Sequence, residues 1–155
     1  MRFRERFLSD SVEEYNLTIM MEKVTIAWTH GTDFELRDQT CDRLNPKALL
    51  LYALARCAGM TAAAIFQKME IEPESFEIIC RGELSTPTLM AESVFVSLDM
   101  NYNVKCRRLK DQVRVSHALD LTHEKYCGLV KMMRKVAPLS HEIYIHSSET
   151  VGQQA

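Results

Sequence analysis

The chain is predicted to fold as a single α+β domain. Segments in which apolar and polar residues alternate, as they do in strands, lie on both sides of one long apolar helix, and two further helices precede a last strand. Of the 155 residues, 46% are hydrophobic and 26% are charged, which is typical of an ordinary globular domain. The sequence has neither internal repeats nor a linker-like segment, so one domain is expected.

The two ends of the chain are expected to lie outside this domain. Residues 1–20 start with a charged, weakly patterned segment and are predicted to be an N-terminal extension of uncertain order, in which Met20 or the following Met21 could be the natural start. The domain itself is predicted over residues 21–147, with a loose tail at residues 148–155. The N-terminal segment lacks an apolar core followed by small residues, so it is not expected to be a secretory signal, and we expect a cytoplasmic protein.

Five strands and two shorter helices are predicted around the long helix. The strands are expected at residues 17–28, 33–37, 76–81, 90–102 and 139–145, and the shorter helices at residues 107–118 and 122–137. In the fourth strand, one face is expected to carry Met90, Val94, Val96, Leu98, Met100 and Tyr102. The opposite face carries polar residues, so one side of the sheet is expected to face water.

The long helix is predicted from Asn45, a capping residue, and Pro46, which is favoured in the first turn, to about Met69. Residues 48–66 are almost uninterruptedly apolar and approach the length of a membrane span. Arg56 lies at the centre of this stretch, where a charge costs roughly 2.5–3.5 kcal/mol on insertion scales. A helix buried in protein on most of its sides is therefore expected, and a membrane span is not.

Several classes of function are disfavoured by composition and motifs. The net charge of −2, with no basic stripe interleaved with aromatic residues, argues against binding to nucleic acid or to an acidic membrane. The five histidines show none of the spacings of helical metal sites, so no metal is expected. No phosphate loop, dinucleotide fingerprint or nucleophile elbow is present, so no bound cofactor is expected.

The five cysteines are the remaining candidates for chemistry. An odd count without a C-x-x-C pair argues against a disulfide scaffold and against a zinc ribbon. Cys57 lies in the long helix among uncharged residues, so that a packed core cysteine and a functional thiol are both open readings. Cys127 has the helical neighbours His123, Lys131 and Arg134, which favour a thiolate. Cys41, Cys80 and Cys106 are interpreted as structural.

Two segments together resemble the OsmC-like family of osmotically inducible and organic hydroperoxide resistance proteins. Residues 45–60, NPKALLLYALARCAGM, match the helix that carries the first cysteine of that family, and residues 123–132, HEKYCGLVKM, match the helix of its second cysteine. The order of the elements between them also fits. The resemblance therefore covers most of the chain after about Met21.

The resemblance implies an intertwined homodimer in which antiparallel sheets wrap around paired central helices and the active sites lie at the subunit interface. In the peroxidase branches, the first cysteine attacks the peroxide and becomes a sulfenic acid, which the second converts to a disulfide that an external thiol reductant reduces. On that pattern Cys57 is the attacking residue and Cys127 the resolving residue. The expected partners are a small-molecule peroxide, a thiol reductant and a second copy of the chain.

The chain also departs from the organic hydroperoxide branch. That branch has a glutamate where this chain has Lys47, and an arginine in a Gly-Arg motif that is missing here. The charged residues that could assist Cys57 are Lys47, Arg37, Arg43, Arg56 and Glu124. The second motif reads C-G-L in place of C-P-Y or C-P-I. The leading hypothesis is a thiol-dependent peroxidase, and the alternatives are a non-catalytic small-molecule-binding protein and a redox sensor.

Overall fold

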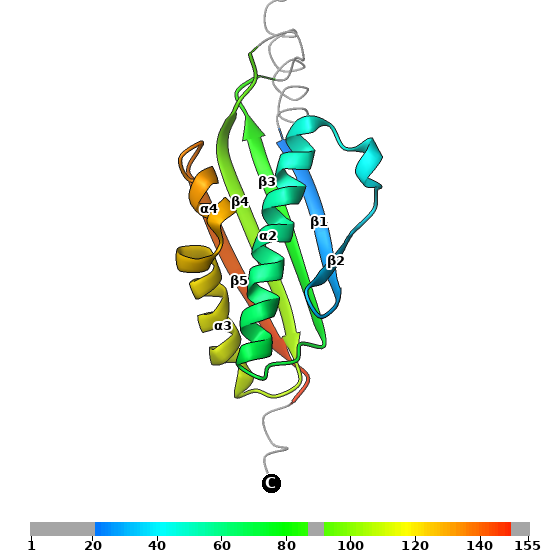
Figure 1. Ribbon diagram of the computed structural model, residues 1–155, viewed down its shortest axis with the longest axis vertical. Helices are drawn as coiled ribbons and strands as arrows, with labels where there is room; N and C mark the ends of the chain where they lie inside the picture. The colour runs from blue at the N-terminus through cyan, green and yellow to red at the C-terminus, as the bar shows by residue number, and fades with distance from the viewer. Residues whose placement is uncertain (1–20, 87–91, 150–155) are drawn as a thin grey trace, which may run out of the picture.

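The computed structural model describes residues 21–86 and 92–149 (Figure 1). The strands are β1 (Met21–His30), β2 (Asp33–Leu36), β3 (Ser75–Leu84), β4 (Phe95–Cys106) and β5 (Leu139–Ser147); the helices are η1 (Cys41–Arg43), α2 (Pro46–Lys68), α3 (Asp111–Leu121), η2 (Thr122–Tyr126) and α4 (Gly128–Met133). The strands form one sheet in the order β2-β1-β3-β4-β5, and α2, α3 and α4 lie over one of its faces. The predicted α+β class is confirmed, whereas the expected extension, residues 1–20, lies outside the described residues.

The hairpin of β1 and β2 forms as predicted, although its expected start at residues 17–20 lies outside the described part of the chain. Gly31, in the left-handed region with φ of 55°, makes the turn between the two strands. Trp28 pairs with Phe34 across the hairpin. β1 also pairs antiparallel with β3, so the hairpin extends the sheet to its outer edge.

Helix α2 begins where the sequence predicts. The side chain of Asn45 caps it by accepting a hydrogen bond from the backbone N–H of Ala48 at 2.9 Å, and Pro46 is the first helical residue. The helix ends at Lys68, one residue before the predicted end. Glu70 follows with a left-handed φ of 55°, a conformation that usually belongs to glycine at this place.

Within residues 21–86 and 92–149, only one face of α2 is covered by the rest of the chain. Residues that include Leu51, Leu54 and Phe66 are buried against the sheet, but Leu49 and Met60 are exposed on the other side. By length and composition alone, α2 could cross a membrane, but core helices of soluble proteins are often as long and as apolar. Of its most apolar stretch, 44% is buried. One face of α2 is thus buried within its own chain, and burial of its other sides stays a prediction.

The pairing of β3 with β4 is antiparallel and corrects the predicted faces of the fourth strand. Leu98, Met100 and Tyr102 point into the core as expected. Val96 is 43% exposed, however, while Phe95 is buried. The register shifts between Glu83 and Leu84, and such an irregularity reverses the alternation on the far side of it. Of the other residues predicted for that face, Val94 is exposed and Met90 lies outside the described residues.

β5 pairs with β4 in parallel, so the sheet is mixed and not wholly antiparallel as the resemblance implied. Parallel neighbours need a long crossover, which α3, η2 and α4 provide. The helix predicted over residues 107–118 starts only at Asp111. The single helix predicted over residues 122–137 is wrong, because the chain makes a π-helical turn, adopts an extended conformation at Cys127 and then starts a new short helix.

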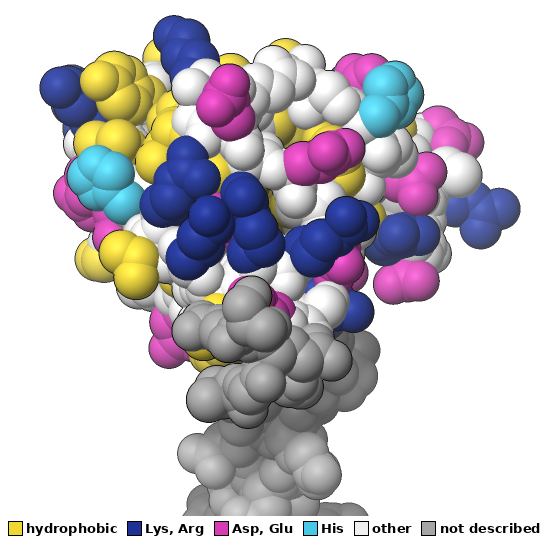
Figure 2. Space-filling view, turned by 90° about the horizontal axis from the view of Figure 1, so that it is seen from below, with side chains coloured by type: hydrophobic (Ala, Val, Ile, Leu, Met, Phe, Trp, Pro, Cys, Tyr) yellow, Lys and Arg dark blue, Asp and Glu magenta, His cyan; other side chains and the backbone are white. Residues whose placement is uncertain are grey.

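Charged residues gather at the end of the molecule where α3 begins. Figure 2 shows Lys and Arg side chains in a row there, with acidic side chains beside them. Asp111 is buried and accepts hydrogen bonds from Arg108 and Arg114, and Lys105 lies 3.7 Å from a carboxylate oxygen of Glu74. The guanidinium groups hold the pKa of Asp111 below its usual value, despite burial, which alone would raise it. Much of this basic row is therefore compensated by carboxylates.

Candidate active site

The two cysteines singled out from the sequence lie in contact, although 70 positions separate them. Cys57 comes from the middle of α2, and Cys127 from the extended residue that opens α4, which packs on α2. Their sulfur atoms are 3.3 Å apart, with Cys127 placed to donate its thiol proton to Cys57 Sγ. No disulfide joins them. The geometry thus presents a reduced dithiol whose sulfurs are within reach of bond formation.

Cys57 is the more accessible member of the pair, since it is half-buried while Cys127 is buried. Thr61, one turn further along α2, donates a hydrogen bond to the carbonyl of Cys57 at 2.9 Å. Arg56 precedes it, and its guanidinium donates to the hydroxyl of Tyr52 at 3.1 Å. The thiol of Cys57 therefore lies on the flank of α2, between its buried and its exposed face.

The surroundings of Cys127 differ from those expected of a thiolate. Burial, together with the neighbouring Cys57 sulfur, raises the pKa of Cys127 to about 11, although the backbone amides of Val130 and Leu129 act in the opposite direction. The positively charged neighbours inferred from a helical wheel assumed a continuous helix. Because the helix breaks at Cys127, that inference is wrong, and Cys127 is a protonated thiol at neutral pH.

His123 illustrates the same correction. It is completely buried and faces Tyr102, whose hydroxyl lies 3.2 Å from Nδ1, and the ring of His141, which stacks on it at 3.8 Å between centroids. Burial first, and then the charges of His141 and Arg134, lower the pKa of His123 to about 3. The imidazole is therefore neutral at neutral pH and contributes no positive charge to stabilise a thiolate.

The charged residues considered as helpers of Cys57 are scattered. Arg37 forms an ion pair with Glu35 at 3.2 Å after β2, and Arg43 is exposed in η1. Glu124 accepts from Arg134 at 2.9 Å. Lys47 lies in the first turn of α2, about ten residues before Cys57, so that Arg56 is the candidate nearest to Cys57 along the helix.

Of the other three cysteines, Cys80 and Cys106 have surroundings that fit structural roles, whereas Cys41 does not. Cys41 is exposed in η1. Cys80 is buried in β3, where burial raises its pKa to about 12. Cys106 ends β4, and burial raises its pKa as well; its sulfur lies within hydrogen-bonding distance of the backbone carbonyls of Arg108 and His146. The two buried thiols are thus held in their protonated, unreactive form.

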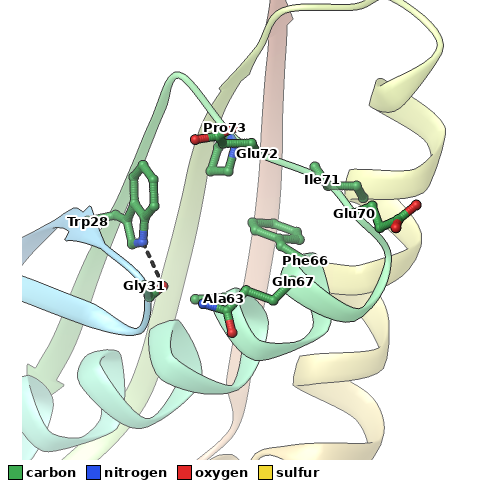
Figure 3. A pocket seen from close by; sticks show the side chains of 9 residues that line it. All are labelled: Trp28, Gly31, Ala63, Phe66, Gln67, Glu70, Ile71, Glu72 and Pro73. Atoms are coloured by element: carbon green, nitrogen blue, oxygen red, sulfur yellow. Dashed lines mark hydrogen bonds between the residues drawn. The ribbon is translucent and has the colours of Figure 1, made fainter.

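Two cavities in the described part of the chain were not predicted from the sequence. A groove of about 800 Å³ lies between α2, α3 and η2 and is lined mostly by apolar side chains, among them Met60, Ala64, Ile65, Leu121 and Tyr126. Thr61, which contacts the carbonyl of Cys57, also lines it. A smaller cavity of about 430 Å³ lies between the turn of the β1–β2 hairpin and the C-terminal end of α2, where the indole of Trp28 donates to the carbonyl of Gly31 (Figure 3). Residues from three elements form the groove, so no single segment could indicate it.

A cluster of possible metal ligands was also not predicted from the sequence. His123 and Glu124 of η2 and His141 of β5 bring one potential metal-ligating atom each to within 4.8 Å of one another. A histidine metal site can be recognised from spacing along the sequence when its ligands lie on one helix. These residues are joined only by the tertiary structure, so their spacing along the chain carried no signal.

Comparisons with known proteins are consistent with one family. A family model described as OsmC-like protein matches residues 39–142. Protein YhfA of Escherichia coli strain K12 is 28% identical over 97 residues, which cover 63% of this chain and 69% of that protein.

Solved structures share the fold at lower identity. The OsmC-like protein from Mycoplasma pneumoniae superposes with a TM-score of 0.55 at 12% identity, over 79% of this chain and 95% of the other. An OsmC-like hydroperoxide resistance protein from Jannaschia gives a TM-score of 0.54 at 13% identity, over 73% and 85%. The organic hydroperoxide resistance protein OhrB of Bacillus subtilis gives 0.50 at 15%, over 78% and 96%. At these identities the superpositions establish the fold.

Proposed function

The chain belongs to the OsmC-like family, and from that membership and the contact between its two cysteines we propose that it is a thiol-dependent peroxidase that reduces organic peroxides, or hydrogen peroxide, in oxidative stress defence. The observation that carries the proposal is the 3.3 Å separation of Cys57 Sγ and Cys127 Sγ. Structural neighbours are named as hydroperoxide resistance proteins, which agrees with a general role in peroxide defence.

The proposed reaction has two steps on the protein. The Cys57 thiolate attacks the terminal oxygen of the hydroperoxide, breaks the O–O bond and becomes a sulfenic acid, while the alkoxide leaves and takes up a proton as the alcohol. The sulfur of Cys127 then attacks the Cys57 sulfur, forms the disulfide and releases water. An external thiol reductant supplies two electrons and two protons to restore both thiols.

The unequal surroundings of the two cysteines support this order of attack. Cys57 is the more exposed sulfur and accepts the hydrogen bond, whereas Cys127 is buried and carries the proton. The high pKa of Cys127 makes it a poor first nucleophile at neutral pH. A resolving thiol needs only to reach the sulfenic acid, and Cys127 already touches that position.

A homodimer is part of the proposal. The outer side of α2 exposes Leu49, Leu50, Ala53 and Met60, an apolar surface that a second copy of the chain would cover. Replacing Ala53 with Phe should overpack that contact by about 1–3 kcal/mol and so weaken dimerisation by about 5- to 150-fold. Sedimentation or light scattering at micromolar concentration measures this, with Val113→Phe on the exposed side of α3 as the control. A wild-type protein that is monomeric under these conditions would contradict the homodimer.

The main alternative is a non-catalytic protein that binds a small apolar ligand, with a redox sensor as a further variant. The groove of about 800 Å³ beside α2 favours this alternative, because it is large enough for a ligand and is mostly apolar. The same groove would also suit the apolar part of an organic peroxide. We propose the cytoplasm as the location, where a small thiol or dithiol protein can serve as reductant.

A peroxidase assay separates these readings. Wild type, Cys57→Ser, Cys127→Ser and the control Cys41→Ser are mixed with cumene hydroperoxide and several thiol reductants, and consumption of peroxide is followed. Cys57→Ser should abolish turnover, Cys127→Ser should stop after one attack and leave a sulfenic acid that dimedone traps, and Cys41→Ser should behave as wild type. Mass spectrometry of the wild type should show the Cys57–Cys127 disulfide after one equivalent of peroxide. Equal consumption by wild type and Cys57→Ser would rule out the proposal.

A further inference from the structure

The cluster of His123, Glu124 and His141 offers two imidazoles and one carboxylate at a single point. His123 and Glu124 are consecutive in the π-helical turn η2, while His141 comes from β5, and a ligand atom from each lies within 4.8 Å of the others. Two histidines with one carboxylate form a donor set that Zn²⁺ and related transition-metal ions prefer. Clusters of exposed acidic residues are common without any ion. The argument for a metal site therefore depends on the burial and hydrogen bonding of His123.

The two ring nitrogens of His123 have different surroundings. Nδ1 lies 3.2 Å from the hydroxyl of Tyr102, and that hydroxyl is oriented to donate to the sulfur of Met100 at 3.8 Å. In the tautomer in which the phenol oxygen accepts from Nδ1–H, the free lone pair of His123 lies on Nε2. Nε2 is fully buried and has no hydrogen-bond partner among residues 21–86 and 92–149.

A buried polar atom without a hydrogen-bond partner destabilises the fold, because it has lost its hydration and gained nothing in return. A cation would satisfy Nε2 directly, since a neutral imidazole with Nδ1–H bonded to the protein and Nε2 free is the usual state of a ligating histidine. Tyr102 would then be the outer partner that fixes the ring. Packing alone leaves Nε2 of His123 without a hydrogen-bond partner among the described residues.

The rest of the cluster is open enough to admit an ion. The side chain of His141 is 22% exposed and that of Glu124 is 61% exposed. Asp120 lies beside His141, with Oδ1 3.6 Å from Nε2, and carboxylates beside ligating histidines commonly orient them. The site thus has one fixed, buried ligand and two that can adjust from the solvent side.

We propose that His123, Glu124 and His141 bind a divalent transition-metal ion of the Zn²⁺ or Co²⁺ type. Three protein ligands leave a fourth position for water. The ligand atoms must move closer together to reach metal–ligand distances of about 2.0–2.2 Å, and the exposed side chain of Glu124 makes most of that movement once it leaves Arg134. The absence of a helical histidine spacing in the sequence excludes only metal sites within one helix.

Arg134 competes with the metal for Glu124. Its guanidinium lies 2.9 Å from a carboxylate oxygen of Glu124, and its positive charge acts on His123 as well. Metal binding has to displace this arginine. Arg134→Gln should therefore strengthen metal binding by about tenfold, since it frees the carboxylate and removes a nearby like charge. A cluster with a purely structural role would show no such gain.

The test uses the full chain without a histidine tag, carrying Cys57→Ser and Cys127→Ser so that the dithiol cannot bind the ion. Co²⁺ binding is followed by visible absorption and calorimetry, with Zn²⁺ as competitor. One Co²⁺ should bind per chain. Affinity should fall at least tenfold in His141→Asn and in Glu124→Gln, and remain unchanged in His146→Asn, an exposed histidine on the same strand.

Two outcomes would overturn the proposal: no saturable Co²⁺ binding, or binding that is the same in His141→Asn and Glu124→Gln as in the parent. Both variants alter partly exposed side chains and should fold, whereas a substitution at the buried His123 could prevent folding. Circular dichroism of each variant checks this. The serine background keeps the result independent of the proposed peroxidase, which needs both cysteines.

Discussion

Acidification should destabilise the protein through His123. The imidazole is buried beside Tyr102 and His141, and burial first, then the charges of His141 and Arg134, lower its pKa from 6.5 to about 3. A histidine with a depressed pKa in the folded state binds its proton more readily in the unfolded chain. Its contribution to stability is therefore fully present above pH 6.5 and is lost as the pH falls from 6.5 towards 3.

The size of the effect follows from the width of this window. Each pH unit in which the unfolded chain binds one more proton than the native chain lowers the free energy of unfolding by about 1.36 kcal/mol. Between pH 7 and pH 5 the loss attributable to His123 is therefore about 2 kcal/mol. Carboxylates such as Asp111 contribute little in this range, because its pKa lies below 3.8 in the folded state and near that value in the unfolded chain.

The assay is urea unfolding at pH 7, 6 and 5 for wild type, His123→Gln and the exposed control His146→Gln. Glutamine does not titrate and can still bond to Tyr102. Wild type and His146→Gln should both lose about 2 kcal/mol between pH 7 and pH 5, and His123→Gln should lose much less, whatever its stability at pH 7. If all three proteins show the same pH dependence, His123 is not held neutral by the fold and the reasoning fails.

Two further predictions concern backbone positions. At Gly82 a Cβ atom would lie 2.6 Å from Cδ1 of Phe95, so Gly82→Ala should lower the free energy of unfolding by about 1–3 kcal/mol. At Gly128 a Cβ would meet no described atom within 4 Å, so Gly128→Ala should leave the free energy of unfolding unchanged or raise it by up to about 1 kcal/mol. Urea unfolding that ranks the two variants in the opposite order would contradict this packing. Glu70 adopts a left-handed φ of 55° after α2, so Glu70→Gly should raise the free energy of unfolding by about 1 kcal/mol, and a loss of stability in the same assay would show that its side chain makes a compensating contact.

Features encoded locally were predicted well from the sequence. The start of α2 depends on Asn45 and Pro46, which act within one turn, and the structure confirms it. Alternation in β3 likewise gave the buried face of that strand. The exposure of Val96 could not be foreseen, because it depends on a shift in the pairing between β3 and β4 rather than on the residues of β4.

The candidate site shows a different limit. The pairing of Cys57 with Cys127 was implied by the family resemblance, and the residues alone left a core cysteine as an open reading. The helical-wheel argument for a thiolate at Cys127 failed because it needed an unbroken helix through residues 122–137. The cluster around His123 could not be predicted from the sequence, because its members come from separate elements. The residues next to a histidine in the sequence also do not indicate whether it is buried.

The break at Cys127 explains both the contact of the cysteines and the position of His123. In an α-helix, residues four apart lie on one face, so His123 and Cys127 would point the same way. Here the backbone N–H of Cys127 donates to the carbonyl of Thr122, five residues back, at 2.9 Å, and the wider turn separates the two side chains. His123 then turns towards Tyr102, and Cys127 reaches Cys57.

The short distance between the two sulfur atoms also determines how a negative result with peroxide should be interpreted. Closing the sulfur atoms from 3.3 Å to a bonded distance of about 2.05 Å requires a movement of only about 1 Å, which side-chain rotation can provide without unfolding α4. Formation of the disulfide should therefore be fast once Cys57 is oxidised. If diamide, a general thiol oxidant, generates the Cys57–Cys127 disulfide but peroxides do not, the resolving step is intact and the attack on peroxide is missing, which would favour the binding protein or redox sensor over the peroxidase.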